Sequence, residues 1–238
     1  MYFSPRIVTS GLRLTLDAAD KNSYPGSGTS WIDLSGNNNT STFVGGPTFS
    51  NINKGTIYFD GVSAYCGITP SNNFLWTPSG IGLNNMTIDL WIKTSDINGA
   101  HYTISKPWNS SGEYNYGINY NTYFNMRVGT QSNSFNFGNI ATGTWKNLVI
   151  LVSSTQFGSY INGSQTVALT NHGITNNTPD YGNGGESLTL MTLYPYGGGG
   201  SSLYSTPGNI GSFRIYNRVL SASEISQNYN ATKTRFGL

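Results

Sequence analysis

Apolar and polar residues alternate with a period of two along most of this chain, and this alternation restricts its fold more than any other feature. Three leucines in residues 12–16 are separated by Arg13 and Thr15, and residues 86–93 repeat the pattern over a longer stretch. Successive side chains of a β-strand point to opposite faces, so such segments are expected to be strands with one face in a core. Trp91 falls on the outward phase of its segment, so we expect that face to be partly covered as well.

Apolar runs and turn signals place further strands. Residues 145–152 form the most apolar run and are predicted to be a central strand, and residues 210–216 are predicted to be a last one. The dipeptide Asn162-Gly163 separates two strand-like segments. It is typical of a type I′ hairpin turn, which needs a positive φ at both central residues. The dipeptide Asp60-Gly61 ends another strand-like segment and marks a second turn.

One helix is predicted, over residues 221–231. Ser221 and Glu224 form a capping box, in which the serine hydroxyl accepts from the third helical amide and the glutamate reaches back to the cap. Leu220 and Ile225 fit a hydrophobic staple around that cap. We expect this short helix to pack against an edge of the layers that the strands form.

The chain shows neither a composition break nor a repeat of fixed period, so one domain is expected over residues 11–238, preceded by an N-terminal arm of residues 1–10. About a dozen short strands with polar turns and one late helix indicate an antiparallel β-sandwich. Its 16 Tyr, 11 Phe and 5 Trp supply a large apolar core. Cys66 is the single cysteine, so an internal disulfide is excluded, and we expect its side chain to be buried as a small apolar group.

The charge balance excludes two classes of partner. Twelve basic and ten acidic residues leave a net charge of only +2. A surface that neutralises nucleic-acid phosphates needs a dense basic stripe, so nucleic-acid binding is excluded. No stretch approaches the roughly 18 apolar residues of a membrane helix, and the N-terminus lacks the pattern of a signal peptide. We therefore expect no membrane partner and synthesis in a cytoplasm.

A set of short motifs occurs in an order and spacing that resembles one known family. The motifs lie in residues 11–18, 23–28, 31–37, 57–61, 86–93, 145–149 and 211–225. Together they resemble the laminin-G-like, concanavalin A-like jelly-roll domains over residues 11–238, especially versions found in structural proteins of tailed bacteriophages, often cyanobacterial or marine. The resemblance implies an all-β, two-sheet antiparallel jelly-roll sandwich whose N- and C-terminal parts pair. It leaves the function open, because lectins, glycanases and structural modules share this architecture.

The C-terminal segment points to a virion. Residues 228–238 resemble the chain ends of phage virion proteins. The resemblance therefore implies a virion structural protein, a capsid decoration or head-fibre module that binds other virion proteins and is made in the host cytoplasm. Fibre proteins are commonly homotrimers, so it also implies self-association. Residues 1–10 and 233–238 have no obvious partner within the sandwich, and we expect attachment to use one of them.

No catalytic constellation accompanies these motifs, so the chain is expected not to be an enzyme. Glycoside hydrolysis needs two carboxyl groups flanking the bond, and glycanases of this architecture usually carry Glu-x-Asp-x-x-Glu on one strand. The corresponding strand here has only Asp89, which we expect to face solvent or a lysine. A Ser-His-acid triad would have to use His101 or His172, and no Gly-x-Ser-x-Gly turn accompanies either.

A calcium site is left open, although no clear motif supports one and we predict no cofactor. Asp17, Asp20, Asp33 and Asp60 offer the oxygen ligands that Ca²⁺ prefers. The segment that begins at Asp33 reads equally well as an Asx-type turn, in which the carboxylate caps local amides. Relatives often follow the Asp-Gly turn with two more acids, and this chain has none there.

Aromatic side chains beside amides and hydroxyls predict sugar contact, because sugars are bound by aromatic faces together with such polar groups. The residues that we expect to contact a cell-surface glycan are Trp108, Tyr114, Asn115, Tyr116, Tyr194 and Tyr196. Cross-strand packing is the alternative for Tyr114 and Tyr116, because tyrosine is favoured in strands. A lectin-like carbohydrate-binding module or a tail-fibre adhesin is therefore the second functional hypothesis.

Overall fold

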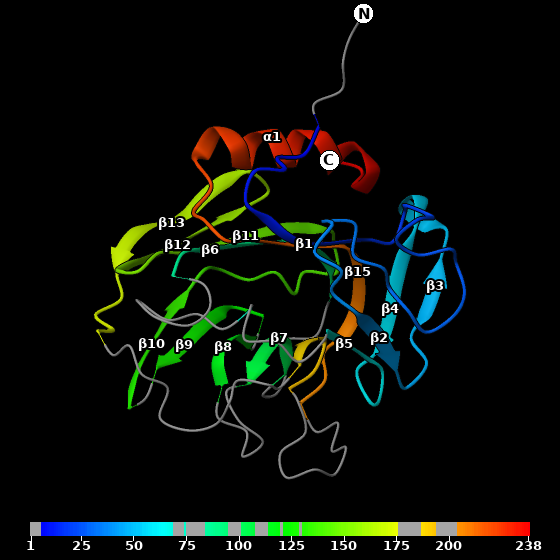
Figure 1. Ribbon diagram of the computed structural model, residues 1–238, viewed down its shortest axis with the longest axis horizontal. Coiled ribbons are helices and arrows are strands. Elements are labelled where there is room, and N and C mark those ends of the chain that lie inside the picture. Colours follow the sequence, from blue (N-terminus) through cyan, green and yellow to red (C-terminus); the bar gives the residue numbers. More distant parts are fainter. Residues whose placement is uncertain are drawn as a thin grey trace, which may run out of the picture.

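Two antiparallel β-sheets stacked face to face form the body of the molecule, as the computed structural model in Figure 1 shows. The structure describes residues 6–68, 74, 84–94, 101–107, 114–119, 121–128, 130–175, 187–193 and 204–238. The predicted two-sheet jelly-roll sandwich with one short C-terminal helix is confirmed.

The larger sheet contains eight strands in the described part of the chain. In spatial order they are β13 (Ser164–Asn171), β12 (Gln156–Ile161), β11 (Lys146–Val152), β6 (Met86–Lys93), β15 (Pro207–Tyr216), β4 (Thr56–Asp60) and β3 (Thr48–Ser50), with β1 (Leu12–Asp17) also paired to β15. The smaller sheet has seven described strands, in the order β10 (Gln131–Asn136), β9 (Tyr123–Val128), β8 (Tyr114–Asn119), β7 (Tyr102–Pro107), β14 (Leu188–Leu190), β5 (Tyr65–Ile68) and β2 (Ser41–Val44). The helical elements are α1 (Ala222–Thr232) and the 3-10 helices η1 (Ile52–Lys54) and η4 (Lys233–Phe236).

The alternating segments form the predicted strands with small shifts at their ends. Leu14 and Leu16 of β1 are fully buried, and β6 spans the whole of the predicted segment 86–93. Strand β11 lies between β6 and β12, as a central strand should. Strand β15 begins at Pro207, three residues before the predicted start, because its pairing with β4 begins there.

Strand β15 organises the larger sheet. It pairs with β6 along one edge, over residues 209–216. Along its other edge it pairs first with β4, over residues 207–210, and then with β1, over residues 212–216. The first and last strands of the domain are therefore neighbours, which confirms the expected pairing of the N- and C-terminal parts.

The Asn162-Gly163 turn joins β12 to β13 as predicted. Asn162 has φ of 51° and Gly163 has φ of 75°, the positive values that a type I′ turn requires. A Cβ atom on Gly163 would lie 2.8 Å from the ring of Tyr229 in α1. Glycine is therefore needed both for the turn and for close packing of the helix onto it.

Apolar side chains from the two inner faces form the core. Ile88 and Leu90 face it from the larger sheet, and Ile118 and Phe124 face it from the smaller one, all with 1% or less of their surface exposed. Cys66 of β5 is also fully buried among them, as predicted, and burial raises the pKa of its thiol well above the ordinary value.

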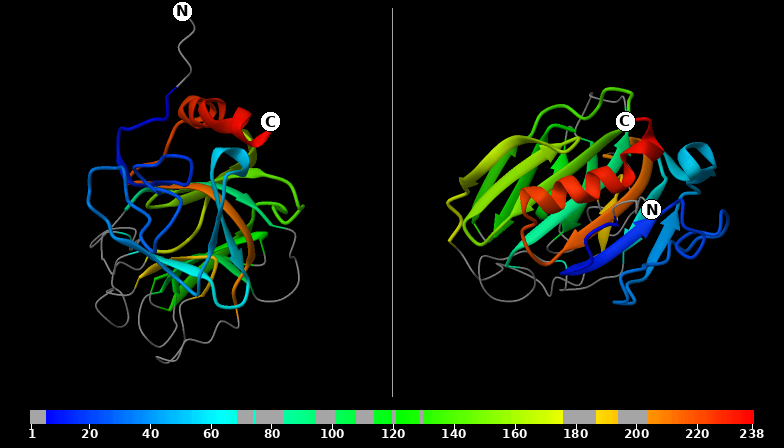
Figure 2. Two further views of the ribbon diagram at one scale, coloured as in Figure 1. Left: turned by 90° about the vertical axis from the view of Figure 1, so that its right-hand side faces the viewer. Right: turned by 90° about the horizontal axis from the view of Figure 1, so that it is seen from above.

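Helix α1 lies across the outward face of the larger sheet and not against its edge, so the expected position of the helix was wrong (Figures 1 and 2). Its capping box forms as predicted, since the Ser221 hydroxyl accepts from the amide of Glu224 and the Glu224 carboxylate accepts from the amide of Ser221. Leu220 and Ile225 are buried against Val149 and Leu151 of β11. Val149 and Leu151 are apolar side chains at outward positions of β11, and their burial favours packing of the helix onto this face.

The outward Trp91 is covered, as predicted. The ring of Phe236 in η4 stacks on it with centroids 4.2 Å apart and planes 16° from parallel. Tyr229 of α1 stacks beside it, and Trp145 packs against the same Phe236 ring. These four aromatic residues form a second, smaller core on the outer side of the sheet.

Asp89 does not face solvent or a lysine, so that prediction was wrong. Its side chain is 1% exposed, because α1 covers this part of the sheet. Its carboxylate accepts hydrogen bonds from Nδ2 of Asn147 at 2.7 Å and from Nδ2 of Asn228 at 3.1 Å. The guanidinium of Arg214, itself 2% exposed, lies 3.4 Å away. One guanidinium and two side-chain amides, from two strands and the helix, thus surround the buried carboxylate of Asp89.

Both terminal segments dock on the sandwich where they are described, contrary to the expectation that they lack partners. In the arm, the Val8 amide donates to Oδ1 of Asn228 at 2.8 Å, and its carbonyl accepts from the Tyr216 hydroxyl at 3.0 Å. At the other end, Arg235 pairs with Asp17 of β1, with Nη1 and Oδ1 2.6 Å apart. Residues 233–238 are thus part of the outer layer.

The tail is expected to stabilise the whole sandwich. Replacing Phe236 by alanine removes a buried ring that contacts two tryptophans, and we expect it to lower the free energy of unfolding by about 3 kcal/mol. Urea denaturation followed by circular dichroism measures this. The control is Leu238→Ala, where the side chain is 46% exposed and the change should be small. Equal midpoints for Phe236→Ala and the unmodified chain would show that the tail is dispensable.

The helix cap is expected to fail in acid. Hydrogen bonds from Arg218 and from the Ser221 amide hold the pKa of Glu224 at about 2, below the ordinary 4.5. A lowered carboxyl pKa stabilises the fold above pH 4.5, and this stabilisation is lost as the pH falls from about 4.5 to about 2. Because the Arg218–Glu224 ion pair is partly exposed, its contribution to the free energy of unfolding is about 1 kcal/mol or less. We expect Glu224→Gln to flatten the pH dependence of the urea midpoint in that window, and an unchanged pH dependence would contradict the prediction.

Candidate functional site

Four of the six residues predicted to contact a glycan lie wholly or partly outside the described residues. Trp108, Tyr194 and Tyr196 fall outside them, and only the backbone of Tyr114, at the start of β8, is described. For these four residues sugar contact stays a prediction.

Asn115 and Tyr116 are both fully buried, so the prediction that these two side chains contact a ligand was wrong. Strand β8 lies inside the smaller sheet, between β7 and β9. Tyr116 points into the core, where its ring stacks near that of Phe124 with centroids 6.2 Å apart. The Nδ2 of Asn115 donates to the carbonyl oxygen of Arg127 at 3.1 Å. For Tyr116, packing was the alternative interpretation, and it is the one that the structure supports.

The loop acids form turns. Oδ1 of Asp33 accepts from the amides of Thr15 and Ser35 at 2.9 and 2.8 Å. Oδ1 of Asp60 likewise accepts from three successive amides after the Asp-Gly turn. These contacts are those of the Asx-type alternative. Among the described residues, no group of three or more His, Cys, Asp or Glu side chains is arranged to hold a metal ion.

His172 is tied to the backbone around it. Its Nδ1 accepts from the amide of Ile174 at 3.1 Å, so the proton lies on Nε2, which donates to the carbonyl oxygen of Ser153 at 3.2 Å. Burial lowers the pKa of His172, which a hydrogen bond to Ser153 only partly offsets. A neutral ring with both nitrogens engaged fits a structural role and not a catalytic one.

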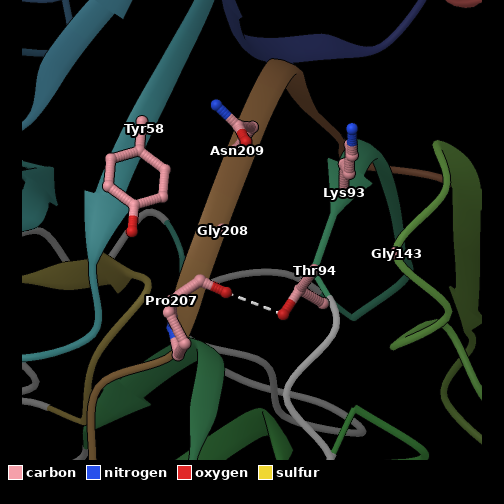
Figure 3. Close-up of a pocket in the computed structure, with 7 residues that line it drawn as sticks. All are labelled: Tyr58, Lys93, Thr94, Gly143, Pro207, Gly208 and Asn209. Carbon is pink, nitrogen blue, oxygen red and sulfur yellow. Dashed lines mark hydrogen bonds between the residues drawn. The ribbon is translucent and has the colours of Figure 1, made fainter.

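A groove on the outward face of the larger sheet has the geometry for a ligand. Its volume is about 230 Å³. Its lining residues, drawn in Figure 3, are Tyr58, Lys93, Thr94, Gly143, Pro207, Gly208 and Asn209. The groove lies on the same face of the sheet as α1, past the part that η4 covers.

Strand register aligns three side chains in the groove. Asn209 of β15 is the register partner of Tyr58 in β4 on one side and of Lys93 in β6 on the other. All three alternate with core residues along their strands, so they share the outward face. Figure 3 shows Asn209 between Tyr58 and Lys93. Tyr58 is 43% exposed and Lys93 is also exposed.

The floor of the groove is held together by short backbone contacts. The Thr94 hydroxyl donates to the carbonyl oxygen of Pro207 at 2.7 Å, and the Gly143 amide donates to the carbonyl oxygen of Thr94 at 2.8 Å. A Cβ atom on Gly208 would lie 2.6 Å from the carbonyl oxygen of Lys93. Glycine therefore lets β15 approach the end of β6 closely, and this places Asn209 beside Lys93.

The groove combines groups that can contact a ligand. It offers an aromatic ring, an amide that both donates and accepts, and an ammonium group. No carboxylate, histidine or cysteine side chain is among the lining residues.

No local sequence pattern predicted this site. Tyr58 was seen only as part of a strand motif, and Asn209 lies just before the predicted last strand. The available signal was that Tyr58 and Lys93 both occupy outward positions of alternating segments. The strand order that brings β4, β15 and β6 together joins residues about 150 positions apart, and no local pattern encodes it.

Comparison with known families agrees with the fold. A family model described as "Concanavalin A-like lectin/glucanases superfamily" matches residues 60–226, more than half of the chain. The chain belongs to this superfamily. The match begins at the Asp-Gly turn and covers β5 to β15 and the start of α1. No curated protein matches the chain in sequence.

Solved structures with the same fold are binding domains of clostridial toxins. The binding domain of Paraclostridial Mosquitocidal Protein 1 superposes with a TM-score of 0.68 at 15% identity, covering 93% of this chain and 52% of that one. The receptor-binding domain of botulinum neurotoxin C/D mosaic serotype gives 0.66 at 17% identity, covering 93% and 51%. The ligand-binding domain of botulinum neurotoxin serotype D, solved in complex with N-acetylneuraminic acid, gives 0.66 at 15% identity, covering 93% and 51%. This chain spans about half the length of each, and the likeness shows the fold alone.

Among the described residues, none of the helices is long and apolar enough to cross a membrane.

Proposed function

We propose that this chain is a non-catalytic carbohydrate-binding module whose ligand lies in the groove of Tyr58, Asn209 and Lys93. The observation that carries the proposal is the register row itself. An exposed aromatic ring, an amide and an ammonium group stand side by side on three adjacent strands of a lectin-type fold.

The row suits a sugar because of the two kinds of surface that a sugar presents. The C–H groups of a sugar ring form an apolar face that packs on an aromatic ring, and Tyr58 offers such a ring in the open. Neighbouring hydroxyls both donate and accept, and the Asn209 amide can meet both roles at once. A few fixed polar groups beside apolar surface are the general pattern of a small-ligand site.

The similar structures support binding over catalysis. They are receptor- or ligand-binding domains, and one of them was solved with a bound sialic acid. In this chain Asp89, the acid on the strand where glycanases carry their motif, is buried under α1 and bonded to three partners. It is therefore not free to protonate a glycosidic bond at the surface.

A single open groove of this size gives weak binding, and several copies would strengthen it. When modules are linked, each later binding event becomes intramolecular, and avidity rises by about 100-fold or more without new contacts. Self-association, which the resemblance to fibre proteins implies, would serve that purpose, and it remains part of the proposal.

The proposal predicts a loss of glycan binding when Tyr58 is replaced by alanine. A glycan array identifies a ligand for the unmodified protein, and calorimetric titration with that ligand measures the change. We expect about a tenfold or greater rise in the dissociation constant, since a stacking contact worth about 1.4 kcal/mol is a factor of ten.

The matched control is Tyr123→Ala. Tyr123 lies on β9 of the other sheet and is 39% exposed, close to the 43% of Tyr58. Its loss should leave affinity unchanged. Equal affinity of the two variants and the unmodified protein would place the ligand elsewhere, and no binding to any glycan would overturn the proposed function.

A second candidate is a virion structural role, as a capsid decoration, head-fibre module or tail-fibre adhesin made in the host cytoplasm. The resemblance of the ordered motifs and of residues 228–238 to phage virion proteins supports it. In this role glycan binding would serve adhesion. Because residues 233–238 are built into the outer layer, contacts with other virion proteins would use the outer surface of the sandwich and not a free tail.

Mass spectrometry of purified particles from the source lysate tests this second candidate. We expect the protein at high copy number in the particles, and cryo-microscopy would then show whether it sits on the capsid or on the tail. Its absence from every particle fraction would sink the virion role and leave the glycan-binding module standing.

A further inference from the structure

We propose that the ligand of the groove is an anionic saccharide, with a carboxylate or sulfate group that pairs with Lys93. This inference rests on the proposed function and names the ligand class for the same site. It is carried by the position of one cation at the end of the row.

Lys93 has no anionic partner among the described residues. The ion pairs found there join Arg214 to Asp89 and Asp17, Arg218 to Glu224, and Arg235 to Asp17. Lys93 is exposed at the end of β6, on the outward face. An ammonium group that lines a groove, with no counter-ion in the part of the chain that the structure describes, is available to an anion from solution.

The spacing of the row sets where the anion lies on the sugar. Adjacent strands are about 4.8 Å apart, so Lys93 stands roughly 10 Å from Tyr58, two strands away. A sugar ring stacked on Tyr58 would extend across Asn209, and a charged substituent at its far side, or on the next residue, would meet the ammonium. The ligand is thus predicted to run across the strands.

Asp60 lies on the same face, and it weakens the attraction only slightly. It follows Tyr58 by two residues on β4, and its register partner is Pro207, which puts it roughly 12 Å from Lys93. That exceeds the screening length of about 8 Å at physiological salt. Burial raises the pKa of Asp60, but hydrogen bonds from the amides of Ala64, Val62 and Ser63 lower it by more, so the net shift is downward. The turn therefore already stabilises the charge of this carboxylate.

A lysine recognises charge more than shape. Its ammonium is a compact point charge, whereas the planar fork of arginine matches a carboxylate in two bonds. The groove therefore fits any anionic group on a sugar of the right length, and the experiment must separate carboxylated from sulfated ligands.

The test is titration of the unmodified protein and of Lys93→Gln with three probes. The probes are sialyllactose, a sulfated lactose and neutral lactose. We expect at least one anionic probe to bind about 3- to 10-fold more tightly than lactose, as fits one exposed ion pair. The substitution Lys93→Gln should remove that difference between the anionic probe and lactose, and Lys93→Glu should weaken binding of the anionic probe further.

The control is Arg13→Gln. Arg13 is an exposed cation on β1, which pairs with the far end of β15 at Tyr216, and its loss should change nothing. Whichever anionic probe shows the preference identifies the group. Equal binding of charged and neutral probes, with Tyr58→Ala still harmful, would overturn the anionic ligand and keep the proposed function. If no probe binds at the groove, both are overturned.

Discussion

The buried pair of Arg214 and Asp89 is the interaction on which the outer layer of this molecule depends. A charge pair removed from water is costly unless its remaining hydrogen bonds are made. Here Asn147 of β11 and Asn228 of α1 complete the shell around the Asp89 carboxylate. Asn228 also accepts from the amide of Val8 in the N-terminal arm. Helix, sheet and arm are thus held in one arrangement by a small polar centre, and apolar packing on either side seals it from solvent.

That outer layer also decides where the sheet is left bare. A Cβ atom on Gly211 would lie only 2.5 Å from the ring of Phe236. The lack of a side chain at Gly211 therefore allows η4 to pack closely on β15. Two residues earlier, Asn209 is open to the groove. The two glycines therefore allow different close contacts of β15. Gly211 allows η4 to pack on the strand, and Gly208 allows the strand to approach the backbone of Lys93. The groove is therefore part of the outward face of the larger sheet that α1 and η4 leave uncovered.

The sequence predicted the fold through local patterns and missed what depends on strand order. Alternation located β1 and β6, and the Asn162-Gly163 turn and the capping box were correct in detail, because each is fixed by a few consecutive residues. The predicted position of the helix and the predicted surroundings of Asp89 were wrong, because both depend on which strands lie beneath α1. For the same reason aromatic density was a poor guide to the site. It singled out Tyr116, whose ring belongs to the core, and passed over Tyr58, a lone tyrosine between two buried residues.

The pairing of β1 with β15 has a consequence for how the protein is made. Val8 and Asn228, which are hydrogen-bonded, lie 220 residues apart in the chain. During synthesis the first strand leaves the ribosome long before its neighbour exists, and its apolar face must wait uncovered until almost the whole domain has emerged. Domains dominated by such distant contacts fold slowly and are prone to aggregate while they wait. Folding of this sandwich therefore waits for β15, and a cell that makes the protein in quantity has to protect β1 until β15 has emerged.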